Sequence, residues 1–141
     1  RSLPGSEPQT GDVYYYPYVW LRQGEHGEPE KDRPCCVAIR LTEGRFRGSD
    51  TFMLALSQSG VPEGGYGEEV PKEIIEGLRK LDSSKSTWLI TSEHNADVSD
   101  HPSFEDCEYL GTIPKSYLLP ILRTLIERLR AGDGEINRTG T

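Results

Sequence analysis

An arginine in front of a proline opens the most apolar stretch of the chain. Arg33 and Pro34 stand directly before a nearly unbroken apolar run that ends at Leu41. A guanidinium can donate two parallel hydrogen bonds to a phosphate, and a rigid proline behind it would hold that fork at the start of a strand. The alternative is an ordinary exposed loop arginine paired with Asp32 or Glu30. Arg33 is therefore the first candidate for binding a phosphate.

Hydroxyl and amide groups follow a second apolar run, the segment 51–57. The group consists of Ser57, Gln58 and Ser59. A serine hydroxyl at the end of a strand can donate a hydrogen bond to a phosphate oxygen. Serines at strand ends more commonly make local turn hydrogen bonds, and that alternative stays open. All three residues are candidates for contacting the same anion as Arg33.

Three further residues could transfer a proton or contact a ligand near Arg33. Glu93 ends the segment 86–93, while Glu25 and His26 lie in the long polar loop before Arg33. A histidine has an ordinary pKa close to neutrality and can serve as a general base. A lone loop histidine is more often simply solvated, so Glu25 and His26 are ligand-binding candidates without an assigned chemical step.

The charge distribution is unusual for a protein that binds nucleic acid. The formal net charge is −7 at pH 7, whereas contacts from Lys and Arg to phosphates usually supply much of the binding free energy. The acidic residues concentrate in 93–108, which holds no Lys or Arg. Arg40, Arg45 and Arg47 cluster around one predicted turn, so Arg45 and Arg47 are candidates for contacting a phosphate backbone from a local basic face.

Neither a metal nor another cofactor is expected. The three histidines are His26, His94 and His101, and neither they nor the cysteines show the paired spacing of metal ligands. No glycine-rich phosphate loop follows a strand and opens a helix. The adjacent Cys35 and Cys36 would point to opposite faces of a strand, which argues against a disulfide framework and favours a reducing cytoplasm.

The length and composition predict one domain. The chain has 141 residues, of which 34% are hydrophobic, enough for one modest core. No apolar stretch approaches the roughly 20 residues that span a bilayer, so we expect a soluble, cytoplasmic protein without a membrane partner. Proline, glycine and serine without periodicity predict weakly ordered ends at 1–10 and 131–141, around a single domain at 11–130.

Strand patterns dominate this domain. Strands are expected at 12–21, with an edge position or a bend at Pro17, and at 34–41, 51–57, 86–93 and 107–113. The near-continuous apolarity of 34–41 and 51–57 predicts that both faces of these strands are covered. A short inserted helix is expected at 71–82, and a closing helix begins near Pro114 and runs on from Pro120. These elements predict an α+β fold with a small, strongly bent antiparallel sheet or partial barrel.

Three segments of the chain, in this order, resemble the MazF/PemK toxin family. They are "GDVYYYPYVWL" (11–21), "KDRPCCVAIRL" (31–41) and "FMLALSQS" (52–59). "TWLITSEHN" (87–95) and "YLGTIPKSYLLPIL" (109–122) are similar to later segments of the PemK-like branch. The resemblance covers roughly residues 11–130 and implies an SH3-like barrel. It also implies a homodimer and, in many members, an endoribonuclease restrained by a cognate antitoxin protein.

The resemblance also implies roles for individual residues. Arg33 matches an arginine that clamps the scissile phosphate and acts as an acid, and Ser57 stands where a threonine is usual. Glu93 matches an acidic position that serves in some members as a base or an RNA contact. A neighbouring arginine should lower the pKa of Glu93, which favours a role in orienting Arg33. Thr91 stands where some relatives have a second arginine.

These roles imply metal-free cleavage of single-stranded RNA to 2′,3′-cyclic phosphate and 5′-hydroxyl ends. The homodimer is expected to use the closing helix through Leu118, Leu119, Leu122 and Ile126. Two alternatives stay open. One is a noncatalytic SH3-like barrel that binds a protein or a nucleic acid, including a topoisomerase poison, and the other is a degenerate relative kept for regulation.

Overall fold

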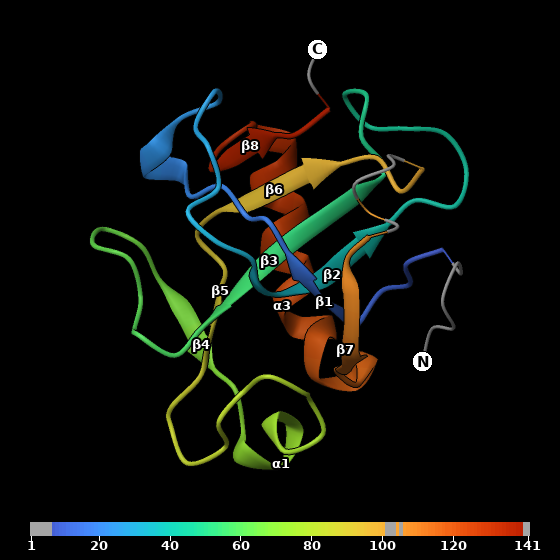
Figure 1. Cartoon of the computed structure of the whole chain (residues 1–141). Helices are drawn as coiled ribbons and strands as arrows, with labels where there is room; N and C mark the ends of the chain where they lie inside the picture. Colours follow the sequence, from blue (N-terminus) through green and yellow to red (C-terminus); the bar gives the residue numbers. More distant parts are fainter. Residues whose placement is uncertain (1–6, 101–103, 105, 140–141) are drawn as a thin grey trace.

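The computed structural model describes residues 7–100, 104 and 106–139 (Figure 1). Its strands are β1 (Asp12–Tyr16), β2 (Arg33–Arg40), β3 (Thr51–Ser57), β4 (Gly67–Glu69), β5 (Trp88–Ile90), β6 (His94–Asp97), β7 (Glu108–Thr112) and β8 (Glu135–Asn137). Its helices are η1 (Leu21–Gln23, a 3-10 turn), α1 (Lys72–Ile75) and α3 (Lys115–Ala131). The described part of the chain is thus α+β, as the sequence predicts.

The strands form one open sheet of eight strands within the described residues. The order along the sheet is β4-β5-β3-β2-β1-β7. β6 pairs with β3 on the same side as β5, and β8 pairs with β6. The strand pairs are antiparallel except for β6 and β8, which are parallel. β3 therefore lies at the centre, with β2 on one side and the β5–β6 segment on the other.

Two hydrophobic clusters cover the two faces of the central strands. On one face, Leu54 of β3 packs in a cluster with Leu118 and Leu125 of α3, which crosses behind the sheet in Figure 1. On the other face, the cluster contains aromatic residues from β1 and the segment after it. The adjacent cysteines confirm the alternation, because Cys36 lies in the first cluster and Cys35 in the second. Every residue of β3 is buried, as the apolar run predicts.

Several elements differ from the sequence predictions. β1 ends at Tyr16, directly before Pro17, and it pairs with both β2 and β7, so it is not an edge strand. α1 covers only Lys72–Ile75 of the helix expected at 71–82. The expected strand at 86–93 is shorter, and a second strand, β6, follows it in the acidic stretch 93–108, between two expected strands.

The expectation of a weakly ordered tail at 131–141 missed a strand. Glu135–Asn137 forms β8 parallel to β6. Arg138, just beyond it, donates hydrogen bonds from its side chain to the carbonyl oxygen of Pro17 and to Oδ1 of Asn95. This segment therefore belongs to the folded domain. Residues 1–6 of the expected N-terminal segment lie outside the described residues.

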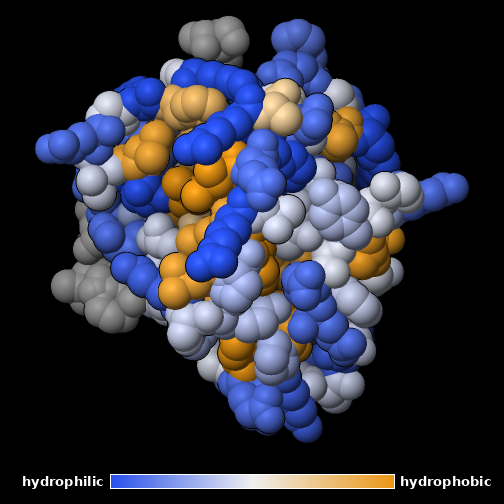
Figure 2. Space-filling view, turned by 180° about the vertical axis from the view of Figure 1, so that it is seen from behind, coloured by the Kyte–Doolittle hydropathy of each residue, from blue (hydrophilic) through white to orange (hydrophobic). Residues whose placement is uncertain are grey.

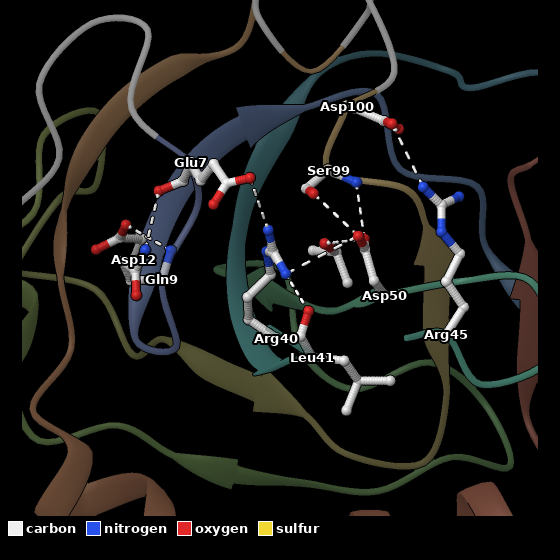
Figure 3. Close-up of polar contacts among 10 residues, drawn as sticks. Glu7, Gln9, Asp12, Arg40, Leu41, Arg45, Asp50, Ser99 and Asp100 are labelled. Carbon is white, nitrogen blue, oxygen red and sulfur yellow. Dashed lines mark hydrogen bonds and ion pairs between the residues drawn. The ribbon is translucent and has the colours of Figure 1, made fainter. Parts of the chain in front are cut away.

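A polar cluster holds the end of the sheet where β2 turns into β3. Figure 3 shows the Arg40 guanidinium between Glu7, at 3.2 Å, and Asp50, at 3.9 Å. The Asp50 carboxylate also accepts hydrogen bonds from the backbone N–H of Ser99 at 2.8 Å and the hydroxyl of Thr51 at 2.9 Å. Burial alone would raise the pKa of Asp50. The hydrogen bonds from Ser99 and Thr51, with the charge of Arg40, instead lower it.

This lowered pKa predicts how the stability of the protein changes with pH. A carboxylate whose pKa is lower in the folded state contributes stability above its unfolded pKa of about 3.9, and loses it as the pH falls through the folded pKa. We expect Asp50→Asn to be less stable than the wild type at pH 7, and the difference to shrink below about pH 4. Urea unfolding of both proteins at pH 7 and pH 3 measures this. An unchanged difference at the two pH values would contradict it.

Candidate functional site

The pairing of β2 with β3 brings Arg33 and Ser57 together. In this antiparallel pair Cys35 lies opposite Ala55. Arg33 is two residues before Cys35 and Ser57 is two residues after Ala55, so the same register places them opposite each other on one face. Arg33 and Ser57 thus lie at one end of the two strands, where the second hydrophobic cluster stops.

Arg33 and Ser57 line a small cavity of about 260 Å³, together with Ser59 and Trp20. Cζ of Arg33 lies 4.8 Å from the centroid of the Trp20 ring, a cation–π contact that supports the guanidinium. Arg45 and Arg47, the other arginine candidates for phosphate contact, do not line this cavity. Arg22 and Glu30 also line it, but these two side chains pair with each other. The charge of Arg33 and the two hydroxyls therefore suit an anion.

Arg33 is not neutralised by the acidic residues beside it in sequence. Among the described residues it forms no ion pair, and its buried Nε makes no hydrogen bond. Glu30, one of the two expected partners, instead binds Arg22, whose Nη2 lies 2.9 Å from both carboxylate oxygens. The alternative of a loop arginine paired with Asp32 or Glu30 is therefore not what this structure contains.

The hydroxyl groups at the end of β3 are partly used by the local turn. Ser57 Oγ donates to the carbonyl oxygen of Gly60 at 2.7 Å, and Ser59 Oγ lies 3.3 Å from Ser57 Oγ. Ser57 is buried whereas Ser59 is exposed. A ligand would have to compete with Gly60 for the Ser57 hydroxyl, so Ser59 is the more accessible donor. Gln58 turns the other way, and its amide nitrogen donates to the Thr87 hydroxyl at 2.8 Å.

A second, larger cavity of about 690 Å³ adjoins the first. The two cavities share Trp20, Arg22 and Pro62, and the second is also lined by Tyr66 and Glu93. Its position follows from an irregularity in pairing. Leu56 of β3 lies opposite Leu89 of β5, and Met53 of β3 lies opposite Asn95 of β6. Three residue steps along β3 therefore correspond to six along the β5–β6 segment. The three residues between β5 and β6 include Ser92 and Glu93, which line the cavity.

Burial controls the ionisation of Glu93. Its side chain is 5% exposed, and Oε2 accepts hydrogen bonds from the backbone N–H of Leu21 at 2.8 Å and the hydroxyl of Tyr18 at 3.2 Å. Burial raises the pKa of Glu93, although the hydrogen bonds from Leu21 and Tyr18 and the charge of Arg128 oppose it. The sequence-based prediction of a pKa lowered by an adjacent arginine is therefore wrong in sign, because desolvation outweighs the nearby cations.

The raised pKa of Glu93 predicts a stabilising substitution. An ionised carboxylate whose pKa is raised by folding destabilises the native state above its folded pKa, and this penalty vanishes as the pH falls below the unfolded pKa. Glutamine keeps an oxygen that can accept from Leu21 and Tyr18 without the charge. We expect Glu93→Gln to raise the melting temperature at pH 7 and to lose this advantage near pH 4. A lower melting temperature at pH 7 would contradict this.

Four candidates lie away from the two cavities in the described structure. Arg45 pairs with Asp100 at 3.3 Å, and Arg47 lies against the ring of Phe46. Both belong to the turn before β3, about 20 Å along the strand from Ser57. In the polar loop, Glu25 accepts a hydrogen bond from the backbone N–H of Asn137, and His26 is exposed. These four residues therefore do not join Arg33.

A buried network that the sequence pattern did not reveal lies around Thr91 and His94, on either side of the cavity residues Ser92 and Glu93. Arg128 of α3 donates from Nε to the carbonyl oxygen of Thr91 at 3.1 Å, and from Nη1 to Nδ1 of His94 at 2.6 Å. Because a guanidinium can only donate, His94 Nδ1 accepts, and Nε2–H donates to Glu135 at 3.0 Å. Burial lowers the pKa of His94, which agrees with a neutral ring. Thr91 itself is not an arginine, but Arg128 reaches the same segment from α3.

No group of three or more histidine, cysteine or acidic side chains could hold a metal ion within 7–100, 104 and 106–139, and His101 lies outside these residues. No helix in the described part of the chain is long and apolar enough to cross a membrane.

The chain matches no protein-family model, no curated protein and no solved structure. The resemblance to the MazF/PemK toxins is therefore an expectation from the quoted segments alone. The geometry adds one feature that the order of segments cannot supply: an arginine and two serines facing one cavity.

Proposed function

We propose that this protein is a toxin-type endoribonuclease that cleaves single-stranded RNA without a metal ion. The observation that carries this proposal is the shared cavity of Arg33, Ser57 and Ser59, in which Arg33 has no ion-pair partner among the described residues. A charged fork and hydroxyl donors on rigid strand ends are suited to the phosphorane that forms during RNA cleavage. The order of the MazF/PemK-like segments supports the same activity.

In the proposed reaction, the 2′-oxygen of the RNA attacks the adjacent phosphorus. The bond from phosphorus to the 5′-oxygen breaks, the 2′-hydroxyl passes its proton to solvent water, and the departing 5′-oxygen takes one from Arg33, which solvent then reprotonates. The products are a 2′,3′-cyclic phosphate and a 5′-hydroxyl. Arg33 clamps the phosphate and, as the resemblance implies, acts as the acid at the 5′-oxygen, while Ser59 and Ser57 donate hydrogen bonds to nonbridging oxygens.

An SH3-like arrangement and a homodimer belong to the same proposal. Leu118 is fully buried in the core, so it cannot serve the dimer contact expected for it. Leu119 is 60% exposed and Ile126 40% exposed on the outer side of α3. Figure 2, viewed from behind, shows orange hydrophobic surface between blue hydrophilic side chains on this side of the molecule. We expect sedimentation to give a dimer at micromolar concentration, and a monomer for Leu119→Glu; a monomeric wild type would contradict this.

A cognate antitoxin is proposed as the second partner. Its expected contact is an acidic segment that covers Arg33, because complementary charge both attracts the partner and blocks the phosphate site. Arg22 lines the same cavity and would add to this attraction, although Glu30 already pairs with it.

The noncatalytic alternative is supported by a different observation. Glu30, Glu63 and Glu93 line the two cavities beside Arg22 and Arg33, and carboxylates repel RNA phosphates. The Ser57 hydroxyl is also occupied by Gly60. A site of this kind could bind a protein or a nucleic acid, including the target of a topoisomerase poison, without cleaving it. A degenerate regulatory relative would have the same features.

One experiment separates these proposals. The purified protein is incubated with a long, weakly structured RNA in EDTA at low salt, and the ends of the fragments are analysed. We expect discrete fragments with 5′-hydroxyl and 2′,3′-cyclic phosphate ends. Intact RNA after incubation with a protein shown to be folded would reject the nuclease proposal and favour the binding module.

A further inference from the structure

We propose that the second cavity, the one lined by Glu93 and Tyr66, binds a guanine base whose phosphate lies at Arg33. This inference rests on the proposed RNA-cleaving function and names the base that the site selects. It gives Glu93 a role in recognising the base instead of removing a proton.

The two cavities are arranged as a nucleotide requires. They share Trp20, Arg22 and Pro62, so a ligand can extend from one into the other. The smaller cavity contains Arg33 and the two hydroxyls that suit a phosphate, beside the Arg22–Glu30 pair. The larger one, at about 690 Å³, has room for a nucleoside and is lined largely by aromatic and apolar groups.

Tyr66 offers a ring on which a base can stack. Its side chain is 52% exposed, although the residue is large and aromatic. Its backbone is held in place, because its carbonyl oxygen accepts hydrogen bonds from the N–H groups of Thr91 at 3.1 Å and Ser92 at 3.2 Å. An exposed ring on a fixed backbone beside a cavity is a common platform for a single-stranded base.

Glu93 has unused hydrogen-bonding capacity at the cavity. Both of the hydrogen bonds from Leu21 and Tyr18 go to Oε2, and Oε1 accepts none from the described residues. A carboxylate oxygen of a largely buried side chain favours a ligand that donates hydrogen bonds to it. A cationic ligand is less suitable, because Arg22 also lines the cavity and both Arg22 and Arg128 act electrostatically on Glu93.

Guanine is the RNA base that best fits an unpaired carboxylate oxygen. Its Watson–Crick edge carries two adjacent donors, N1–H and N2–H. Uracil presents one N–H between two carbonyl oxygens, which a carboxylate repels, whereas adenine and cytosine each place one amino group beside an acceptor nitrogen. The neutral donors of guanine also tolerate the nearby arginines. We therefore assign base selection to Glu93 and stacking to Tyr66.

The test is equilibrium binding of the four nucleoside 3′-monophosphates and the four 5′-monophosphates to the intact chain. We expect the guanine nucleotide to bind at least about 10-fold more tightly than the others in one of the two sets. Glu93→Gln should abolish this preference, while Tyr66→Ala should weaken guanine binding roughly 10-fold. Glu63→Gln, an exposed carboxylate of the same cavity, is the matched control and should keep the preference.

The outcomes also separate this inference from the proposed function. Equal binding of all four bases, or an unchanged preference in a folded Glu93→Gln variant, overturns the guanine site. Mapping the RNA fragments provides an independent check. Cleavage at phosphates without an adjacent guanine overturns the inference and leaves the nuclease, whereas guanine-selective binding without any cleavage supports the inference and rejects the nuclease. If the Glu93→Gln variant cleaves no RNA but still binds guanine nucleotides selectively, Glu93 acts as the general base and not in base selection.

Discussion

The Arg33→Ala variant is expected to cleave RNA more than about 100-fold more slowly than the wild type while keeping its fold. Alanine removes the positive charge that stabilises the phosphorane in the proposed reaction and both donors of the guanidinium fork. Because Arg33 forms no ion pair with the described residues and contributes mainly its contact with the Trp20 ring, the loss in stability should be small, about 1 kcal/mol or less. Initial rates on one RNA, measured beside thermal unfolding, give both quantities.

Two further variants show whether the effect belongs to the geometry of Arg33. Arg33→Lys keeps the charge but loses the planar fork, so we expect cleavage to fall at least about 10-fold. Arg45→Ala removes an arginine that is exposed, paired with Asp100 and located near the other end of β3, and should change the rate less than about twofold. Cleavage by Arg33→Ala at the wild-type rate would contradict the assignment of Arg33 to the phosphate site.

The central strands and the position of Arg33 could be predicted because local sequence determines them. β3 coincides with the predicted 51–57, and β2 begins one residue before the predicted 34–41. Both runs are apolar, so burial on two faces is the arrangement available to them. Consecutive antiparallel strands then place the start of one beside the end of the next, which is why Arg33 and Ser57 meet.

The elements that sequence analysis missed are made of polar residues with distant partners. β6 is the polar stretch "HNAD", yet all four residues are buried. His94 forms hydrogen bonds with Arg128 and Glu135, and Asn95 forms hydrogen bonds with Val19, which lies 76 residues away in sequence. No local pattern reveals such partners, so the stretch resembles a loop. The raised pKa of Glu93 was hidden for the same reason, because it depends on the burial that these contacts create.

The second large effect is expected for Asn95→Ala, which should lower the free energy of unfolding by about 3 kcal/mol. The Asn95 side-chain amide makes two hydrogen bonds with the backbone of Val19. Its Oδ1 accepts from the Val19 N–H at 2.9 Å, and its Nδ2 donates to the Val19 carbonyl oxygen at 2.7 Å. Val19 is buried, so alanine at position 95 leaves a backbone donor and an acceptor without partners. Each such buried group costs about 1–3 kcal/mol, and urea unfolding measures the sum.

The same substitution links the stability of the sheet to the site. Val19 precedes Trp20, whose ring supports Arg33 and lines both cavities. We therefore expect Asn95→Ala to shift the tryptophan fluorescence of the native protein as well as to destabilise it. Asn137→Ala is the control. Its amide nitrogen makes a longer, exposed contact of 3.5 Å with the carbonyl oxygen of Arg47, and its Oδ1 accepts from the backbone N–H and the hydroxyl of Thr139, two residues away. Loss of these local contacts should cost about 1 kcal/mol. An equal decrease in the free energy of unfolding for the two variants would show that the two hydrogen bonds to Val19 contribute no more than the contacts of Asn137.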